Sequence, residues 1–469
     1  MTDVVLIFML PKFNYNIKFQ PQGVLHLASA LEKEGIGVKI LDMNVDFWSK
    51  EKTLKFLLKE DPKVVGIGAM SNQTRDAVNF ASYFKENGLD SKIVLGGPHV
   101  TLCPDFVKKF KMFDYGFVGE GEITFPRMVK NIMKGNSPKK KIIRGKRPEN
   151  LDKLPLPAYH LLDMKKYRLP HTSMRFCTAM TSRGCPYNCK FCNAPMLSGQ
   201  KVRFKSIDKV MEEIKILNEE FKVGNILFTD ENFTFNERRV TEICQRIIKE
   251  KIDIKWLCET RVDLVNNKLL KLMHKAGCRT IGFGVESGSE KIRNKVKGTP
   301  PSDKVVERAF NLCDKIGIKS AAFLILGHPD DTREDIIKTL EYPLKLNADF
   351  IYPNPSFILP STSTFKTAVR RGLIEKNEWD RYASGEISHA PIFKPNGMSV
   401  EEIMRMIIKL DAIFYLRPYT IARRLKKIKN FDDFATLVRA SRDIVIHTLK
   451  ADFFVKRFFY TYLSKPKNQ

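Results

Sequence analysis

The 469-residue chain has no uninterrupted apolar run near the roughly 18 residues that a membrane-spanning helix needs. Its N-terminus, MTDVVLIFMLPKFNYN, has no basic residues before the apolar stretch and no small-residue cleavage site. We therefore interpret this stretch as a first core strand rather than a signal peptide, and predict a cytoplasmic protein. The chain is too long for one ordinary hydrophobic core, which predicts two or three domains.

Acidic residues are in the minority, with 53 Asp and Glu against 80 Lys and Arg, for a formal net charge of +27. Such a charge suggests nucleic acid, an anionic membrane or an acidic substrate as partner, but a lysine-rich organism would produce the same balance. No RNA- or DNA-binding motif accompanies the charge, so we expect no nucleic-acid partner. No G-x-G-x-x-G motif follows the first predicted strand, so a Rossmann dinucleotide site is not supported.

Alternating β-rich runs and helical stretches fill residues 1–135. Five such units predict a flavodoxin-like, doubly wound parallel sheet that binds its ligand at the carboxyl ends of the strands. Residues 136–171 are rich in Pro and basic residues without a sustained period, which predicts a linker. Residues 172–365 carry six further strand–helix units and predict a partial (β/α)6 barrel, with functional residues at the carboxyl ends of its strands. Residues 366–469 predict a basic, helical C-terminal region.

Three of the nine cysteines are clustered. Cys185, Cys189 and Cys192 form a C-x3-C-x2-C pattern directly after the first barrel strand. Three thiolates at this spacing can bind one metal centre and leave a position open, and thiolates suit zinc or an iron–sulfur cluster. A structural zinc would need a fourth ligand, and a strand separates the candidates Cys177 and His171 from the loop.

This spacing, with an aromatic residue before the last cysteine, resembles the signature of the radical S-adenosylmethionine (radical SAM) superfamily. The resemblance implies a 4Fe–4S cluster whose fourth iron binds S-adenosylmethionine, which reductive cleavage converts to a deoxyadenosyl radical. Segments after the next four strands, FTDENFTFN, ETRVDLV, GFGVESGSE and LILGHPDDT, resemble the family's S-adenosylmethionine-binding loops. The residues that the resemblance implies are Asp230, Glu231 and Asn232 for the amino group, Arg261 for the carboxylate, Glu286 and Ser287 for the ribose or methionine, and Gly327 and Pro329 for the adenine.

The N-terminal segments PQGVLHLASALEKEGIGVKILDMN, IVLGGPHVT and FVGEGEITF resemble the cobalamin-binding domain that precedes many radical SAM cores. The implied cobalamin-binding residues are Gly96, Gly97, His99, Gly119, Glu120 and Gly121, with Ser71, Asn72 and Thr74 facing the corrin. The domain lacks the Asp-x-His-x-x-Gly motif with which some cobalamin proteins ligate cobalt. We therefore expect cobalamin without a protein imidazole on cobalt, and a domain that has lost cobalamin is the alternative.

The resemblance implies an enzyme acting on an unactivated carbon, with C-methyl transfer as the commonest outcome and an electron donor such as ferredoxin or flavodoxin. Radical ring formation or oxidation is one alternative, and a non-catalytic, zinc-bearing nucleic-acid binder supported by charge alone is another. The segment AIFYLRPYTIARRLKKI resembles the tetrapyrrole cyclase and hopanoid-type members, which implies a small, apolar or lipid-like substrate.

The same C-terminal segment combines basic and apolar residues. Six cations are crowded there: Arg417, Arg423, Arg424, Lys426, Lys427 and Lys429. One interpretation is peripheral docking on an anionic membrane. The other is a lid helix packed on the barrel with its charges in water. Pro418 interrupts any single long helix here, which weakens the membrane interpretation.

Overall fold

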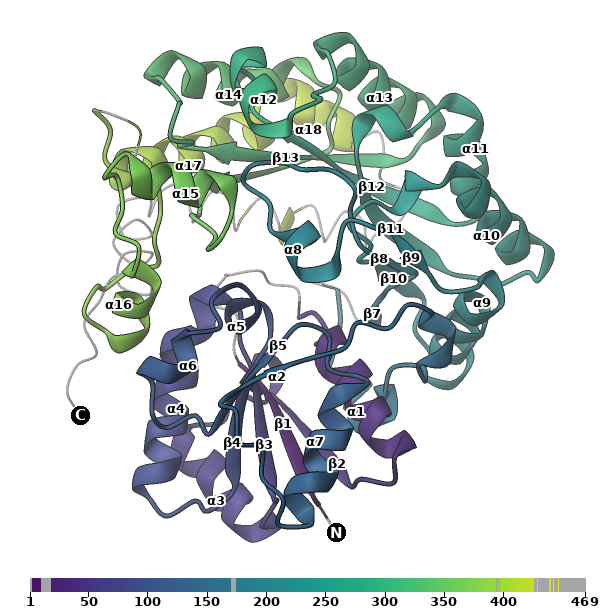
Figure 1. Ribbon diagram of the computed structural model, residues 1–469. Helices are drawn as coiled ribbons and strands as arrows, with labels where there is room; N and C mark the ends of the chain where they lie inside the picture. Colours follow the sequence, from purple (N-terminus) through teal and green to yellow (C-terminus); the bar gives the residue numbers. More distant parts are fainter. Residues whose placement is uncertain are drawn as a thin grey trace.

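The computed structural model describes residues 2–9, 18–169, 174–393, 395, 397–425, 428, 438, 439, 442 and 446. Two parallel sheets of six strands each lie beside one another, and helices cover them (Figure 1). Within the described residues, no helix has the length and apolar character needed to cross a membrane.

The N-terminal sheet has the strand order β2-β1-β3-β4-β5-β6, with all pairs parallel. Its strands are β1 (Val4–Phe8), β2 (Val38–Asp42), β3 (Val64–Gly68), β4 (Lys92–Gly96), β5 (Tyr115–Val118) and β6 (Ile142–Arg144). Its helices are α1 (Gln22–Lys33), α2 (Met43–Asp46), α3 (Lys50–Glu60), α4 (Thr74–Glu86), α5 (Pro98–Leu102), α6 (Phe106–Lys109) and α7 (Thr124–Met133).

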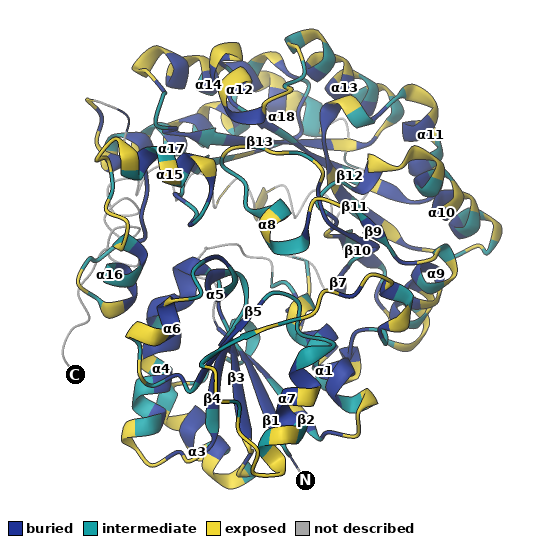
Figure 2. Cartoon of the chain, in the orientation of Figure 1, coloured by how far each residue is buried: buried dark blue, intermediate teal, exposed yellow. Residues whose placement is uncertain are grey.

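Helices cover both faces of this sheet, because its central strands are apolar on both sides. Val5 and Ile7 of β1 pack into one core with residues of α3 and α4. Val4 and Leu6 pack into a second core with residues of α1 and α7. Helices expose their outer surfaces and bury the surfaces that face the sheet (Figure 2). The predicted doubly wound sheet is confirmed.

The sixth strand, β6, lies in the segment that we expected to be a linker. Ile142 aligns with Gly116 of β5 in parallel register. Only three residues long and preceded by lysines, β6 has no periodic pattern that would predict it. Further along the same segment, Tyr159 and Tyr167 are buried in the core of the barrel. The described part of this segment, residues 136–169, is therefore partly integrated into both domains.

The second sheet has the order β14-β13-β12-β11-β10-β7, again all parallel. Its strands are β7 (Phe176–Ala179), β10 (Asn225–Phe228), β11 (Lys255–Thr260), β12 (Cys278–Glu286), β13 (Lys319–Leu326) and β14 (Phe350–Pro355). Its helices are α9 (Ile207–Lys215), α10 (Glu237–Lys249), α11 (Asn267–Lys275), α12 (Glu290–Lys297), α13 (Asp303–Ile316) and α14 (Arg333–Lys345). Neighbouring strands follow one another in the chain, and β7 and β14 are the two edges. This open sheet confirms the predicted partial (β/α)6 barrel.

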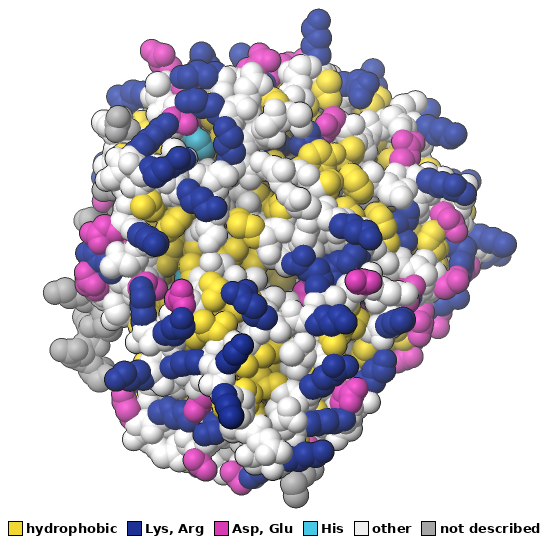
Figure 3. All heavy atoms as spheres, viewed as in Figure 1, with side chains coloured by type: hydrophobic (Ala, Val, Ile, Leu, Met, Phe, Trp, Pro, Cys, Tyr) yellow, Lys and Arg dark blue, Asp and Glu magenta, His cyan; other side chains and the backbone are white. Residues whose placement is uncertain are grey.

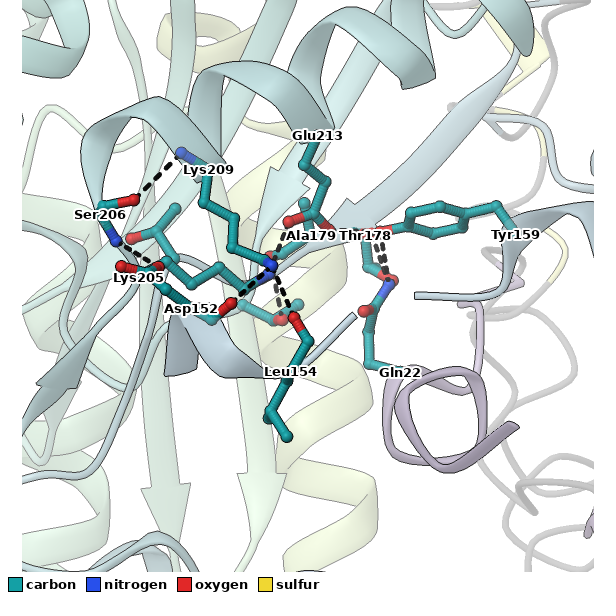
Figure 4. A network of polar contacts seen from close by, with 12 residues as sticks. Gln22, Asp152, Leu154, Tyr159, Thr178, Ala179, Lys205, Ser206, Lys209 and Glu213 are labelled. Atoms are coloured by element: carbon teal, nitrogen blue, oxygen red, sulfur yellow. Dashed lines mark hydrogen bonds and ion pairs between the residues drawn. The ribbon is translucent and has the colours of Figure 1, made fainter. Parts of the chain in front are cut away.

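A buried network of polar side chains joins the N-terminal domain to the barrel (Figure 4). Gln22, the first residue of α1, donates to the carbonyl oxygen of Thr178 in β7 at 2.5 Å. The Tyr159 hydroxyl donates to Glu213 at 2.8 Å, and Lys205 binds the other oxygen of Glu213 at 2.5 Å. Because the Lys205–Glu213 pair is almost fully buried, removing one partner alone would leave an uncompensated charge.

The C-terminal helices are α15 (Ser363–Arg370), α16 (Glu378–Ser384), α17 (Val400–Leu416) and α18 (Pro418–Leu425). Tyr382 of α16 lies against the Arg75 guanidinium of α4, 4.2 Å from the ring centroid, so this region also contacts the N-terminal domain. Ile403 and Phe414 of α17 are buried in the barrel core, and the Tyr415 hydroxyl accepts from the backbone nitrogen of Ile351 on edge strand β14.

Three of the six clustered C-terminal cations bond to the barrel. Arg417 donates to the carbonyl oxygen of Leu344, Arg423 to Asp314, and Arg424 to the carbonyl oxygen of Asp349. Lys426, Lys427 and Lys429 lie outside the described residues.

Candidate active site

The cysteine loop follows β7 and is held by a short two-stranded sheet. Strand β8 (Ser182–Arg183) pairs with β9 (Arg203–Phe204), and helix α8 (Ala194–Ser198) lies between them in the chain. Gly184 has a φ of +114°, and a Cβ there would overlap the carbonyl oxygen of Lys201, so only glycine fits this turn. The backbone nitrogen of Lys190 donates to Val296 O at 2.7 Å, which ties the loop to the end of α12.

Two of the three sulfurs already accept hydrogen bonds. Asn232 Nδ2 donates to Cys185 Sγ, and the backbone nitrogen of Ala194 donates to Cys192 Sγ, each at 3.4 Å. Burial raises the pKa of the Cys192 thiol to about 11, so its thiolate needs a positively charged partner such as a metal.

In the described part of the chain, no three His, Cys, Asp or Glu side chains converge on a position for a single ion. In a four-iron cluster each thiolate binds its own iron, so the sulfurs need not share one point. The alternative zinc ligand His171 lies outside the described residues, and the Cys177 side chain is buried in the barrel core.

The loop after β10 supports the cysteine loop. Asp230 is buried and accepts from the backbone nitrogen of Thr181 at 3.0 Å, from the Thr181 hydroxyl at 2.7 Å and from the Ser182 hydroxyl. Glu231 accepts from the backbone nitrogen of Gly184 at 3.2 Å. The family resemblance implies that this loop binds the amino group of S-adenosylmethionine, and these contacts show that Asp230 and Asn232 also bond to the cysteine loop and the residues before it.

Arg261 lies at the end of β11 beside the cysteine loop. Its guanidinium is 4.1 Å from the ring centroid of Tyr187, which lies between the first two cysteines. Its Nε and Nη2 atoms bind the Asp263 carboxylate at 2.9 and 2.8 Å. Nη1 is buried and has no hydrogen-bond partner among the described residues. A planar cation with a spare donor at this place fits a carboxylate ligand.

Glu286 and Ser287, at the end of β12, have different surroundings. Glu286 has a φ of +70° and forms an ion pair with the buried Lys297 at 3.2 Å. The Ser287 hydroxyl is buried against the Thr339 hydroxyl at 2.8 Å, so it supports packing against α14. Lys297 was not predicted from the sequence. The available signal was its position as a basic residue in the last turn of α12, directly before Gly298.

The turn after β13 contains Gly327 and Pro329. Gly327 has a φ of +88°, and its backbone nitrogen donates to Asp331 at 2.9 Å. Burial raises the pKa of Asp331 to about 7. Pro329 is half-buried in the same turn. The structure thus places this turn at the carboxyl end of its strand, as predicted, and shows no contact that tests its role toward adenine.

A cavity of about 530 Å³ lies between the two domains. Gly96, Gly97, Gly119, Glu120 and Gly121 line it from the strand ends of the N-terminal sheet. Met180, Arg183, Leu197, Ser198, Thr229 and Glu231 line it from the barrel side. On the face shown in Figure 3, hydrophobic side chains lie in the hollow between the domains, with Lys and Arg side chains around it.

Glycines leave room on the N-terminal side of this cavity. A Cβ at Gly96 would meet only Phe117 Cβ at 4.0 Å, and one at Gly119 only the Gly145 carbonyl oxygen at 3.9 Å. A Cβ at Gly23 would meet nothing within 4 Å. Side chains at these positions would therefore occupy the cavity, which is suited to a bulky ligand lying close to the backbone.

Glu120, predicted to bind the cofactor, lines the cavity and is also bound by three arginines. Its carboxylate binds Arg183 at 2.7 Å, Arg203 at 2.5 Å and Arg147 at 2.9 Å. Arg183 also binds Glu122 at 2.7 Å. The carboxylate thus joins the N-terminal sheet to β8 and β9. The local motif around Glu120 could not predict these contacts, because the arginines lie far along the chain.

Four of the predicted cobalamin residues lie away from the cavity wall. Ser71, Asn72, Thr74 and His99 are buried and are not among the described residues that line it. His99 Nδ1 is 3.0 Å from the Ser71 hydroxyl, and its ring packs against Phe106. Burial lowers the pKa of His99 to about 3, so the imidazole is neutral. Met70, directly before Ser71, and Thr101, two residues after His99, line the cavity.

Comparison with known proteins accounts for this arrangement. Residues 180–342 match the Radical SAM superfamily, and residues 14–129 match the B12 binding domain. An uncharacterised methyltransferase of Pyrococcus horikoshii is 32% identical over 86% of this chain and 89% of its own length. The chain belongs to the B12-binding radical SAM enzymes. This membership removes the zinc-bearing nucleic-acid binder from the alternatives.

Further proteins are similar to this chain over most of its length. The anaerobic magnesium-protoporphyrin IX monomethyl ester cyclase of Rubrivivax gelatinosus is 25% identical over 87% of this chain and 77% of its own. The hopanoid C-2 methylase of Rhodopseudomonas palustris is 25% identical over 75% of this chain and 64% of its own. The solved structure of OxsB, a cobalamin-dependent S-adenosylmethionine radical enzyme, has a TM-score of 0.70 at 18% identity, over 97% of this chain and 72% of that one.

The cofactors of this radical SAM enzyme are a 4Fe–4S cluster, S-adenosylmethionine and cobalamin. The residues present fit all three. Three thiols lie in one loop, the spare Nη1 of Arg261 suits the methionine carboxylate, and the glycine-lined cavity has room for a corrin.

Proposed function

We propose that this enzyme transfers a methyl group to an unactivated carbon of an apolar, lipid-like substrate. One observation carries the proposal: the interdomain cavity is lined on its barrel side by residues that flank the cysteine loop. Met180 and Arg183 precede Cys185 in the chain, and Glu231 accepts a hydrogen bond from Gly184. A ligand in this cavity and a cluster on the loop would therefore face the same space.

The relatives support both parts of the proposal. The relative in Pyrococcus horikoshii is named a methyltransferase, and the hopanoid methylase is named for a methylation of a lipid. The cyclase relative supports the second candidate, radical ring formation without methyl transfer.

When bound, the cofactors supply a carbon radical that can remove a substrate hydrogen and a methyl group that can replace it. The protein supplies binding, orientation and exclusion of water. Arg261 offers Nη1 to a carboxylate, and the Glu286–Lys297 pair presents one acceptor and one donor beside it. Asp230 and Asn232 hold the cysteine loop in place. An electron donor such as ferredoxin or flavodoxin, both acidic proteins, is the partner we propose for this basic chain.

The test uses the anaerobically reconstituted full-length protein, a reductant, a total lipid extract of the producing organism and S-adenosylmethionine deuterated in its methyl group. We expect an apolar product that carries the labelled methyl and forms together with 5′-deoxyadenosine. The Cys189→Ala variant, treated identically, should give neither product. Formation of 5′-deoxyadenosine with a product that gains a ring or a double bond but no label would contradict methyl transfer and support the cyclase alternative.

A further inference from the structure

The inner face of the barrel strands is only partly filled. The side chains that point outward from these strands, such as Cys258 and Phe283, are at most 1% exposed. On the inner face, Leu257 and Phe323 are half-buried, and Tyr352 is 37% exposed. Closed barrels fill this space with layers of large side chains. This barrel has room for a ligand in its interior.

Glu259 of β11 lies on this inner face. More than a third of the residue is accessible to solvent, yet desolvation by the surrounding protein raises the pKa of its carboxyl. Both observations hold when the solvent that Glu259 contacts is enclosed inside the barrel. Glu259 and Leu257 are two positions apart on β11 and therefore lie on the same, inward face of the strand.

A glycine on the neighbouring strand makes the space beside Glu259. A Cβ at Gly282 of β12 would overlap the Phe323 ring and lie 3.3 Å from Glu259 Cγ. The Glu259 side chain and the Phe323 ring therefore both lie over the backbone of Gly282, where a larger residue would have its Cβ. Phe323 in turn stacks on Tyr352, with ring centroids 5.2 Å apart and planes 21° apart. A carboxylate and two aromatic rings thus line one part of the interior.

Glu259 forms no hydrogen bond or ion pair within the described residues, unlike the other carboxylates around it. Asp230 is bonded to Thr181 and Ser182, and Glu286 is paired with Lys297. After desolvation, the negative charge of Glu286 also raises the pKa of Glu259. An enclosed carboxylate without a partner is costly for a protein to maintain. Its counterpart must come from a ligand.

We propose that Glu259 binds a cationic nitrogen of the substrate, while the Phe323–Tyr352 stack contacts the adjoining apolar part. A cation is favoured over a neutral donor because the Glu259 carboxylate and two aromatic rings, which attract cations, line the space, whereas the charge of Glu286 is balanced by Lys297. This inference rests on the proposed function, since it requires that the substrate enters the barrel. It narrows the lipid-like substrate to an amphiphilic amine.

S-adenosylmethionine is the other molecule that Glu259 could contact. Arg261 and the Glu286–Lys297 pair, at the strand ends, already offer partners to its polar groups. Glu259 precedes Arg261 by two residues, which places it about 7 Å deeper along the strand. The experiment must therefore measure binding of S-adenosylmethionine separately.

The test compares the wild type with Glu259→Gln, which keeps the shape of the side chain and removes its charge. Glu341→Gln, at an exposed position of α14, is the control for loss of one charge. Calorimetry on the reconstituted holoenzyme measures the binding of hexylamine, hexanol and hexanoate, which share one alkyl group. Cleavage of S-adenosylmethionine with dithionite and no substrate reports the cofactor site. Iron content and circular dichroism check that each variant is folded.

We expect the wild type and Glu341→Gln to bind hexylamine about tenfold or more tightly than hexanol, and Glu259→Gln to bind the two equally. Cleavage of S-adenosylmethionine should stay within about twofold in all three proteins. Equal binding of hexylamine and hexanol by the wild type would overturn the proposal. Loss of S-adenosylmethionine cleavage in Glu259→Gln, with amine selectivity retained, would also overturn it and assign Glu259 to the cofactor. Because these assays require no methylated product, a failure of the proposed methyl transfer would be seen separately.

Discussion

Gln20 of the N-terminal domain pairs with Thr178 of the barrel as a neighbouring strand would. Its side-chain Oε1 accepts from the backbone nitrogen of Thr178 at 2.9 Å, and its Nε2 donates to the carbonyl oxygen of Phe176 at 2.7 Å. Both groups lie on the edge of β7 that faces away from β10. The side-chain amide therefore satisfies the open edge of the barrel sheet and connects it to the cavity that Gln20 lines.

Replacing Gln20 by alanine should destabilise the protein by about 2–3 kcal/mol, because two buried backbone groups lose their partner. Chemical unfolding followed by circular dichroism measures this change. Gln200→Ala is the matched control, since Gln200 is exposed and bonds only to the exposed Asn188 side chain. A midpoint for Gln20→Ala equal to that of the control would show that water replaces the amide without cost.

Cys185→Ala, Cys189→Ala and Cys192→Ala should each abolish iron–sulfur absorbance and 5′-deoxyadenosine formation, because a cluster held by three thiolates does not tolerate the loss of one. Cys244→Ala is the control, since its thiol is buried between α10 and the sheet. This variant should keep both signals. Iron retained at the wild-type level in all three loop variants would contradict the assignment.

Gly96→Val should lower the uptake of hydroxocobalamin at least about tenfold and leave the iron content unchanged, because the added side chain would enter the cavity. Gly224→Val is the control, since a Cβ there would meet nothing within 4 Å and Gly224 does not line the cavity. Uptake by Gly96→Val equal to that of the control would place cobalamin elsewhere.

The electron paramagnetic resonance spectrum of bound Co(II) should lack nitrogen splitting, since no described residue lining the cavity is a histidine. Triplet splitting from an axial imidazole would refute this prediction. Its disappearance in His99→Ala would then identify His99 as the ligand.

Acid should destabilise the fold through its buried neutral histidines. Burial lowers the pKa of His99 to about 3 and that of His328 to about 4, from an ordinary 6.5. As the pH falls below 6.5, the unfolded chain takes up protons that the folded protein does not. Each such histidine therefore removes about 1.4 kcal/mol per pH unit until its folded pKa is reached. His99→Gln should flatten the pH dependence of the unfolding free energy between pH 6.5 and 4, and an unchanged slope would contradict this.

Membrane docking by the C-terminal cations remains testable. Arg417, Arg423 and Arg424 bond to the barrel, so attraction to a membrane would depend on Lys426, Lys427 and Lys429. We expect little co-sedimentation with anionic or neutral liposomes at either low or high salt. Salt-sensitive binding to anionic liposomes, abolished by replacing these three lysines with glutamine, would instead establish docking.

The elements of both sheets could be predicted because each strand carries its own local signal. Cys278–Glu286, for example, contains the β-rich run TIGFGV and ends in a polar residue at the carboxyl edge. Strand β6 could not be predicted, since its three residues owe their conformation to pairing with β5 rather than to their own sequence pattern.

Site residues were predicted less completely, because a motif shows where a residue lies and not what it touches. Arg261 and Glu286 lie beside the cysteine loop as expected. Asp230, Ser287 and Glu120 occupy the expected loops, yet their polar atoms bond to distant parts of the protein. Gln20 and Glu259 were missed: the first acts through a partner far along the chain, and nothing in the short strand Lys255–Thr260 marks the second as a binding residue.

The contact of the cysteine loop with the C-terminal region has a consequence for biogenesis. The backbone nitrogen of Thr364 donates to the carbonyl oxygen of Lys190, inside the loop, at 3.0 Å. During translation the three cysteines emerge long before Thr364, so the loop acquires its last backbone restraint only when most of the barrel has been made. Delivery of iron and sulfide to a nascent chain would meet an unfinished loop, so we expect cluster insertion to follow synthesis of the barrel strands.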